Sequence, residues 1–403
     1  MPASTLKMNN RAYIVALLVC FLACLPCRIQ AEEQDTWEAV SISMSNDGRH
    51  LAVKYGAHVE KEDRDESGYD SGVWIYNLND LSSPPRHLRG AEFYGTLIAF
   101  SPDSRHISLA EHHRLQVFNI AENTLILDLP SIATEIASDF STVSYSADGK
   151  FIMSLSDWWA TDDHEMSIWD IGAGTRILAI PSARAAQSRL PLPRLSPDWR
   201  QFLNWWHPDG IQIHEFDIQQ GLGSTLGSVS VDVRDERGVA FSPDSSLFAL
   251  VIPDDEIKIF RTDTWELTYI QMLGVHSCGN ADVTLAFGHI NPWLIFKCDW
   301  YGRLLVWDIE TGVLLLQSEE AGRFRFITLD DRVLVTQSGN LPGGSTIEVW
   351  DTKNDFEMSV YPGINPQIHP NSELMAAIGP DGRVWIWNIK SKQLLVTLPV
   401  PRH

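Results

Sequence analysis

The sequence lacks the short motifs that mark common catalytic and cofactor sites. It contains no HExxH zinc motif, no Walker phosphate loop and no Gly-x-Ser-x-Gly nucleophile elbow. The stretch from Gly221 to Gly227 reads GLGSTLG, a spacing that does not match a dinucleotide fingerprint. His112 and His113 are adjacent, so on a strand their side chains point to opposite faces and cannot bind one metal ion together. The sequence therefore predicts no catalytic residue and no enzyme activity.

Basic residues are also scarce. The 403 residues include 31 Lys and Arg against 52 Asp and Glu, a formal net charge of −21 at pH 7. A surface with this excess of negative charge repels nucleic acid and anionic lipid. We therefore expect no nucleic acid among the partners.

No hydrophobic run reaches the length of a membrane span. The apolar stretch of residues 12–27 has 16 residues, whereas a spanning helix needs about 20. Lys7 and Arg11 precede it, and Ala31 offers a small residue at a cleavage point before Glu32. These features are typical of a secretory signal peptide. We expect residues 1–31 to be this signal, and residues 32–403 to form a single extracytoplasmic domain, secreted or periplasmic.

Two alternatives remain for the N-terminal segment. It could stay uncleaved as a membrane anchor, or Cys24 could be lipidated, since Ala23 supplies the small residue that a bacterial lipobox needs before its cysteine. Phe21 departs from that lipobox pattern. In both alternatives the protein contacts a membrane only through its N-terminus.

Cysteine is rare, with five residues in the chain and three of them in the first 31. Removal of the signal leaves Cys278 and Cys298. In an oxidising compartment this pair can form a disulfide. Two separately buried thiols are the alternative, because the sequence does not give the Cα separation that a disulfide requires.

Amphipathic helical windows are absent from Trp37 onward, and one strand-and-turn unit recurs eight times instead. Short apolar stretches alternate with Gly, Pro, Asn, Asp and Ser turns, a pattern typical of all-β proteins. The first turn of each unit begins at Ser45, Ser101, Ser146, Ser196, Ser242, Gly288, Leu329 and His369. The closing aromatic and polar pairs are Tyr76-Asn77, Phe118-Asn119, Trp169-Asp170, Phe216-Asp217, Phe260-Arg261, Trp307-Asp308, Trp350-Asp351 and Trp387-Asn388.

The spacing of these pairs, 37 to 51 residues, predicts a β-propeller. A unit of this size holds four short strands, and so small a sheet buries both faces only when neighbouring units stack around a ring. We expect eight blades of four antiparallel strands. A seven-bladed ring with a displaced terminal repeat is the alternative.

The Ser-Pro-Asp-Gly-like turn, the second Asp-Gly-like turn and the Trp-Asp pair together resemble the repeats of the WD40 family over residues 37–400. The resemblance implies a non-catalytic protein-interaction scaffold. Together with the expected signal peptide, it leads us to expect an exported, stand-alone ring that is monomeric. The family's Gly-His dipeptide is largely missing, so its buried Asp-His-Ser-Trp network should be incomplete in most blades. Repeat eight supplies its own outer strand, Leu394 to Leu398, so ring closure should rest on face packing, helped by Asp35 to Trp37.

In the WD40 arrangement the turns between second and third strands share one face, the top face. From turn to closing pair, repeats one and three have 31 and 23 residues, against 17 to 20 in most repeats. Aromatic side chains gather there and are enriched at interface hot spots. Core packing of these rings is the alternative. The residues that we expect to bind a protein partner are Tyr55, Tyr69, Trp158, Trp159, Trp205, Trp206, His207, Trp300 and Tyr301.

The insertion in repeat one, residues 60–71, resembles a calcium loop. Asp63, Asp65, Ser67 and Asp70 surround Gly68 in a DxDxDG-like pattern, and calcium is bound by six to eight oxygens. Ser67 replaces the third acid and no clear bidentate Glu follows, so a flexible acidic loop is the alternative. We expect no other cofactor.

Two further function classes fit an exported propeller. One is an enzyme of the lactonase, glycosidase or quinoprotein kind with its site in the central channel, for which His207, Asp254, Asp255 and Asp299 are candidates. The other is a carbohydrate-binding propeller, in which the same tryptophans would stack on a sugar ligand.

Overall fold

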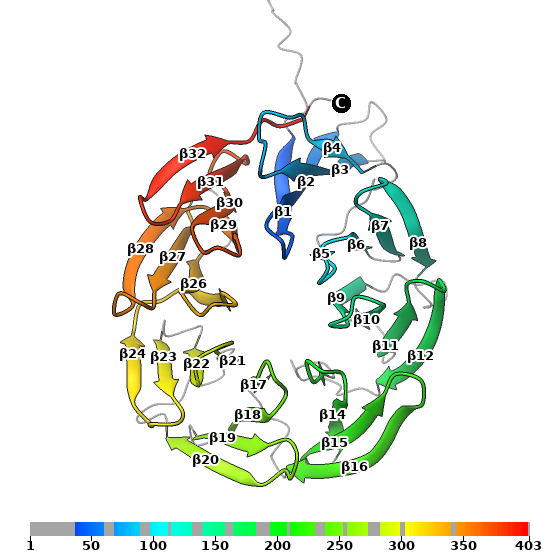
Figure 1. Cartoon of the computed structure of the whole chain (residues 1–403), viewed down its shortest axis with the longest axis vertical. Helices are drawn as coiled ribbons and strands as arrows, with labels where there is room; N and C mark the ends of the chain where they lie inside the picture. Colours follow the sequence, from blue (N-terminus) through cyan, green and yellow to red (C-terminus); the bar gives the residue numbers. More distant parts are fainter. Residues whose placement is uncertain are drawn as a thin grey trace, which may run out of the picture. The chain divides into compact units, whose positions relative to one another are not determined.

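The eight predicted repeats form eight blades. The computed structural model describes residues 37–59, 68–88, 97–111, 114–130, 139–157, 164–182, 194–207, 210–229, 238–252, 256–272, 283–298, 303–339 and 344–401. These residues form 32 strands, which pair into eight four-stranded antiparallel sheets arranged in a ring (Figure 1). Each sheet uses four consecutive strands. The all-β, eight-bladed prediction is confirmed, and the seven-bladed alternative is wrong.

The first half of the ring contains blades 1 to 4. Their strands are β1 (Glu38–Met44), β2 (His50–Val59), β3 (Gly68–Asn77) and β4 (Arg86–His87); β5 (Leu97–Phe100), β6 (His106–Glu111), β7 (Arg114–Asn119) and β8 (Thr124–Pro130); β9 (Asp139–Tyr145), β10 (Phe151–Asp157), β11 (His164–Asp170) and β12 (Thr175–Ser182); β13 (Arg194–Leu195), β14 (Gln201–His207), β15 (Gly210–Asp217) and β16 (Gly221–Val229).

The second half contains blades 5 to 8. Their strands are β17 (Gly238–Phe241), β18 (Leu247–Ile252), β19 (Glu256–Arg261) and β20 (Leu267–Met272); β21 (Val283–Phe287), β22 (Trp293–Cys298), β23 (Arg303–Asp308) and β24 (Leu314–Ser318); β25 (Arg323–Ile327), β26 (Val333–Ser338), β27 (Thr346–Asp351) and β28 (Glu357–Pro362); β29 (Ile364–Ile368), β30 (Leu374–Ile378), β31 (Val384–Asn388) and β32 (Gln393–Thr397).

Each repeat motif has a fixed place in its blade. The second residue of every closing pair ends a third strand, as Asp351 ends β27, and every repeat turn joins a first strand to a second one. All eight of these first turns have five residues between the strands. In seven of them the fourth residue has a positive φ, as in Gly48 at 70° and Ser245 at 61°. Glycine adopts this backbone readily, whereas serine does so at a cost.

Hydrogen bonds within the turns explain their recurring Ser and Asp. In blade 2 the Ser101 hydroxyl donates to Asp103 Oδ1 at 2.6 Å and accepts the backbone N–H of His106 at 2.9 Å. Burial alone would raise the pKa of Asp103. The hydrogen bonds from Ser101 and from the Arg105 backbone outweigh burial and hold this pKa below its usual value. The carboxylate therefore stays charged and fixes the turn.

The core lies between neighbouring blades. One cluster, for example, joins Ile257 of blade 5 to Leu285, Phe296 and Trp307 of blade 6, all of them buried. The third strands of blades 2, 6 and 7 each have four consecutive buried residues. Such runs occur where a sheet packs on both of its faces, which is the position of a blade in a closed ring.

Face packing closes the ring, as predicted. β32 pairs with β31, so blade 8 has its own outer strand. Leu51 of blade 1 and Ile378 of blade 8 belong to one buried cluster, and Trp37 packs against it. The backbone N–H of Ala39 donates to the Gly382 carbonyl at 2.7 Å across the same seam.

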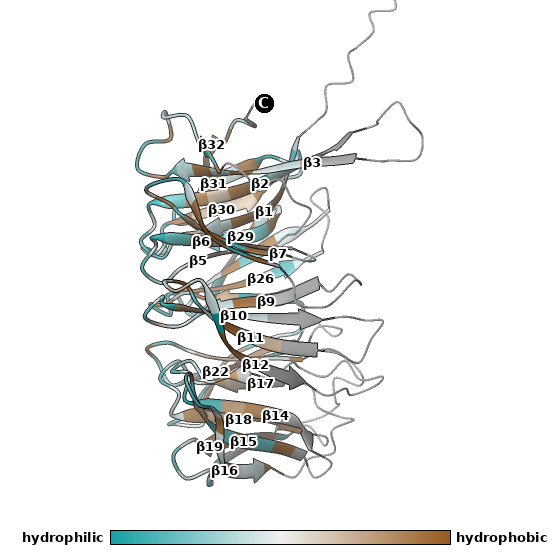
Figure 2. Cartoon of the chain, turned by 90° about the vertical axis from the view of Figure 1, so that its right-hand side faces the viewer, coloured by the Kyte–Doolittle hydropathy of each residue, from teal (hydrophilic) through white to brown (hydrophobic). Residues whose placement is uncertain are grey.

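Antiparallel pairing places the turns on two faces of the ring. The first-to-second and third-to-fourth strand turns share one face, which we call the lower face (Figure 2). The top face carries the second-to-third turns and the connections between blades. The turn between β30 and β31 is the one second-to-third turn whose residues are all described.

Candidate functional site

The predicted aromatic site is described only in part. Trp158, Trp159, Trp300 and Tyr301 lie outside the described residues. The backbone of Tyr69 lies on β3, and the backbones of Trp205, Trp206 and His207 lie on β14. The side chains of these four residues are outside the description. Their partner-binding role stays a prediction.

The prediction that Tyr55 belongs to this surface site is wrong. Its side chain has an exposed fraction of 0% and belongs to the cluster that closes the ring between blades 1 and 8. Its hydroxyl lies 3.0 Å from that of Tyr76, and its ring contacts Trp74 edge-on at 5.6 Å. Burial raises the pKa of the Tyr55 hydroxyl far above its usual value. Tyr55 lies in the middle of β2, and both faces of a blade are buried, so its ring fills the core instead of the surface.

The calcium prediction remains untested. Asp63, Asp65 and Ser67 lie outside the described residues, and only the backbone of Asp70 is placed, on β3 opposite Ala57. The β2–β3 ladder continues to Val59 and Gly68, so residues 68–71 are strand and not loop. Within the described part of the chain no three His, Cys, Asp or Glu side chains gather as metal ligands would.

Several other predictions also fall outside the described residues. These include the signal peptide and the channel candidates Asp254, Asp255 and Asp299. Buried Cys298 is disulfide-bonded, whereas Cys278 is not described, so the pairing of these two cysteines stays a prediction. No helix in the described ranges has the length and hydropathy of a membrane span.

On the lower face, hydrogen bonds join successive first turns. The backbone N–H of Asp47 in blade 1 donates to Ser104 Oγ of blade 2 at 3.1 Å. The same bond joins Asp198 of blade 4 to Ser245 of blade 5 at 3.0 Å. Between blades 6 and 7, the Asp331 carboxylate accepts the backbone N–H groups of residues 289–291 at 2.7 to 2.8 Å. On the lower face these bonds therefore connect blade 1 to blade 2, blade 4 to blade 5 and blade 6 to blade 7.

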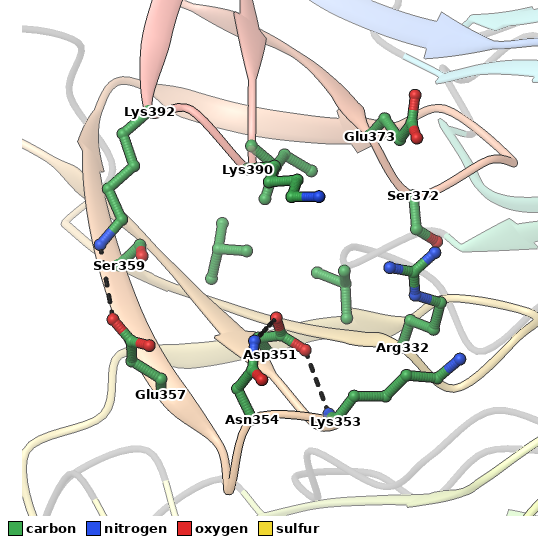
Figure 3. A pocket seen from close by; sticks show the side chains of 13 residues that line it. Arg332, Asp351, Lys353, Asn354, Glu357, Ser359, Ser372, Glu373, Lys390 and Lys392 are labelled. Carbon is green, nitrogen blue, oxygen red and sulfur yellow. Dashed lines mark hydrogen bonds and ion pairs between the residues drawn. The ribbon is translucent and has the colours of Figure 1, made fainter.

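A pocket of about 400 Å³ opens on the lower face between blades 7 and 8 (Figure 3). Turn residues and strand ends of both blades line it, with Val333, Val349 and Ile389 as its apolar wall. No sequence motif pointed to this site. Its charged and polar lining residues are Arg332, Asp351, Lys353, Asn354, Glu357, Ser359, Ser372, Glu373, Lys390 and Lys392.

Comparisons with known proteins agree with the propeller fold. No known protein-family model matches the chain. The WD repeat and SOCS box-containing protein 1 of Homo sapiens is 27% identical over 142 residues, which are 28% of this chain and 33% of that protein. The chain therefore spans about a third of the length of this curated relative.

Solved structures match over most of the ring. Sqt1 from Chaetomium thermophilum has a TM-score of 0.60 at 11% identity, covering 88% of this chain and 97% of that one. The C-terminal WD40 domain of Sif2 has a TM-score of 0.57 at 15% identity, covering 86% and 94%. A chain of the Mitotic Checkpoint Complex has a TM-score of 0.52 at 13% identity, covering 73% and 90%.

The chain has the WD40 propeller fold. Within this WD40 propeller, the expected incomplete Trp network is confirmed for the described residues. In blade 3, Trp169 Nε1 donates to Ser154 Oγ at 3.1 Å. In blade 8 the indole nitrogens of Trp385 and Trp387 are buried without a hydrogen-bond partner.

Blade 7 of the WD40 propeller has a longer network, which also includes a buried carboxylate. Trp350 Nε1 donates to Thr336 Oγ1 at 3.0 Å, and the Thr336 hydroxyl donates to the buried carboxylate of Glu348. Glu348 also accepts the Ser338 hydroxyl at 2.6 Å and the backbone N–H of Gly322 at 2.9 Å. A carboxylate with this many donors is satisfied despite its burial.

Proposed function

We propose that this protein is an exported, non-catalytic scaffold that binds a protein partner on its top face. One observation carries the proposal. The eight first turns of the lower face all have five residues, whereas the connections of the top face range from one residue at Gly363 to eleven at residues 183–193. Loops of variable length on a rigid scaffold are the usual carriers of recognition.

Two further points support a protein as the ligand. Propellers with this fold include a chain of the Mitotic Checkpoint Complex. In the sequence, Trp158-Trp159 and Trp300-Tyr301 fall between the second and third strands of blades 3 and 6, and Trp205-Trp206 are near the end of the second strand of blade 4. Aromatic rings supply large contact areas at low entropic cost, which suits a protein interface.

Affinity capture from the envelope fraction of the producing organism tests the proposal. Residues 32–403 would serve as bait beside a variant with Trp158, Trp159, Trp205 and Trp206 changed to Ser. A matched control carries Arg105→Ser and Arg200→Ser, two exposed changes on the lower face. Circular dichroism first establishes that all three baits are folded. We expect a partner that the wild type and the control retain and that the aromatic variant loses.

Other outcomes favour other functions. If the aromatic variant retains the same partners, the top-face site is wrong. Competition of the captured partner by soluble sugars would favour a carbohydrate-binding propeller, and turnover of a lactone or glycoside panel would favour an enzyme. Export is tested separately by mass spectrometry of the exported chain, which should begin at Glu32 if the signal peptide is removed after Ala31.

A further inference from the structure

We propose that the pocket between blades 7 and 8 binds a small organic anion, a phosphate or carboxylate group on an apolar body. The pocket lies on the lower face, so it is independent of the partner proposed for the top face. Its volume of about 400 Å³ is within the range of small-molecule sites.

The lining of the pocket is unusually basic for this chain. Four of its thirteen residues are Lys or Arg, whereas 31 of all 403 residues are. Three acidic residues also line it. Glu357 lies 3.7 Å from the ammonium group of Lys392, so these two charges compensate each other. The Glu373 carboxylate points away from the other side chains drawn in Figure 3.

The third acid, Asp351, is already engaged. Its carboxylate accepts the backbone N–H of Lys353 at 3.1 Å and the side-chain amide of Asn354 at 2.6 Å. Across the described residues, no carboxylate forms a salt bridge with the ammonium groups of Lys353 or Lys390. Arg332 lies beside Asp330, which also accepts the Ser372 hydroxyl at 2.9 Å. Lys353 and Lys390 are therefore the cations available to a ligand.

Lys353 and Lys390 occupy the same position of the repeat, and repeats one to six have no basic residue there. Both lie two residues after their closing pair, in Trp350-Asp351-Thr352-Lys353 and in Trp387-Asn388-Ile389-Lys390. Blades 7 and 8 are neighbours, so the equivalent positions line one pocket from both sides (Figure 3). In repeats one to six this position is occupied by Asn79, Ala121, Gly172, Gln219, Asp263 and Glu310.

The rest of the lining suits an amphipathic anion. Val333, Val349 and Ile389 supply an apolar surface, and Ser359 and Asn354 supply polar groups beside it. The ammonium groups of Lys353 and Lys390 can bind phosphate or carboxylate oxygens as point charges. A neutral ligand of the same shape would use only the apolar part.

Isothermal titration of the full chain tests this assignment at low ionic strength. The probes are phenyl phosphate, benzoate and benzyl alcohol, which share an aromatic body and differ in charge. We expect one or both anions to bind and benzyl alcohol to bind at least tenfold more weakly. Comparison of the two anions tells phosphate from carboxylate recognition. The Lys353→Gln, Lys390→Gln double variant should lose at least tenfold in affinity for the preferred anion.

The control is Lys150→Gln, which removes an exposed lysine from a first turn of blade 3 and should leave binding unchanged. Lysines 353 and 390 are both on exposed turns, so the double variant should fold, as circular dichroism would verify. Unchanged affinity in the double variant would place the anion elsewhere. Equal binding of benzyl alcohol, or no binding of either anion up to about 10 mM, would overturn the proposal.

Discussion

The backbone N–H of Asp198 in blade 4 donates a hydrogen bond to the hydroxyl of Ser245 in blade 5, at 3.0 Å. Ser245 has a φ of 61°, a backbone region in which glycine would be less strained. The equivalent residues of blades 1 and 3 are indeed Gly48 and Gly149. The serine therefore provides a contact between blades that glycine cannot make, at the cost of backbone strain.

Ser245→Ala and Ser245→Gly separate these two effects. Alanine loses the hydrogen bond and keeps the strain, so the free energy of unfolding should fall by about 1 kcal/mol. Glycine loses the same bond but relieves strain of similar size, so its stability should lie within about 0.5 kcal/mol of wild type. Urea unfolding followed by tryptophan fluorescence measures both variants. Equal destabilisation by Ala and Gly would show that backbone strain at this turn is negligible.

Asp331→Ala should weaken the contact between blades 6 and 7. The change removes three backbone hydrogen bonds and the one from the Asn291 side chain at 3.1 Å. Water can replace part of them because His289 and Ile290 are exposed, so we expect a loss of about 2–4 kcal/mol. Hydrogen exchange of the backbone amides of residues 289–291 should accelerate.

Asp355→Ala is the matched control for this change. Asp355 has a φ of 52°, close to the 53° of Asp331, but lies exposed in a turn of the same blade. Alanine therefore meets a similar backbone conformation at both positions. If the two variants lose equal stability, the carboxylate contacts of Asp331 contribute nothing.

Thr336→Val should destabilise blade 7 by about 2–4 kcal/mol. Valine matches threonine in shape but leaves the indole N–H of Trp350 without its acceptor and removes one donor from the Glu348 carboxylate. Thr336→Ser keeps the hydroxyl and loses one buried methyl group, so it should cost about 1 kcal/mol. Thermal unfolding of the three proteins gives the order. A valine variant as stable as the serine variant would contradict a role for the network.

Alkaline pH should destabilise the ring through Tyr76. Burial raises the pKa of its hydroxyl to about 12, above the value of 10 expected in the unfolded chain. Between these two pH values the folded protein retains a proton that the unfolded chain releases. The free energy of unfolding therefore falls as pH rises through this window, by up to about 1.4 kcal/mol per pH unit for this group.

Tyr76→Phe should make that alkaline slope shallower. The change also removes the 2.8 Å hydrogen bond from the Tyr76 hydroxyl to the Pro399 carbonyl and leaves the buried Tyr55 hydroxyl without its 3.0 Å partner, so it should cost about 1–3 kcal/mol at neutral pH. Urea unfolding at pH 8, 10 and 11 compares the two proteins. An identical slope in both would mean that other groups cause the alkaline loss.

The sequence predicted the architecture because the repeat fixes it. Each closing pair, such as Trp350-Asp351, ended a third strand, since the same apolar and turn pattern recurs eight times. In repeat seven the pattern was misplaced by one residue. The turn begins at Thr328, whose hydroxyl donates to Asp330 at 2.6 Å as the serines do in other turns. Thr328 was not recognised as the equivalent of the serines in the other turns, because the sequence alone does not show this hydrogen bond.

Site residues were harder to predict than blades. Tyr55 was assigned to the top face because it was counted among the aromatic residues of the second-to-third turns, but its ring fills the seam between the first and last blades. The pocket between blades 7 and 8 was not predicted from the sequence at all. Lys353 and Lys390 are ordinary exposed turn residues in the sequence, and only the adjacency of blades 7 and 8 brings them to one cavity. A signal for the pocket was present in the sequence, because both lysines occupy the same position of the repeat, two residues after the closing pair.

Every sheet among the described residues consists of four consecutive strands, so none of these sheets borrows a strand from a distant part of the chain. Trp37 and Val400, near the two ends of the ring, both pack on the same cluster at its seam. The chain could thus begin at a different blade and still form the same ring. A circular permutant opened between the exposed residues Glu319 and Glu320, which connect blades 6 and 7, and joined across the old ends would start with blade 7 and keep all eight sheets whole.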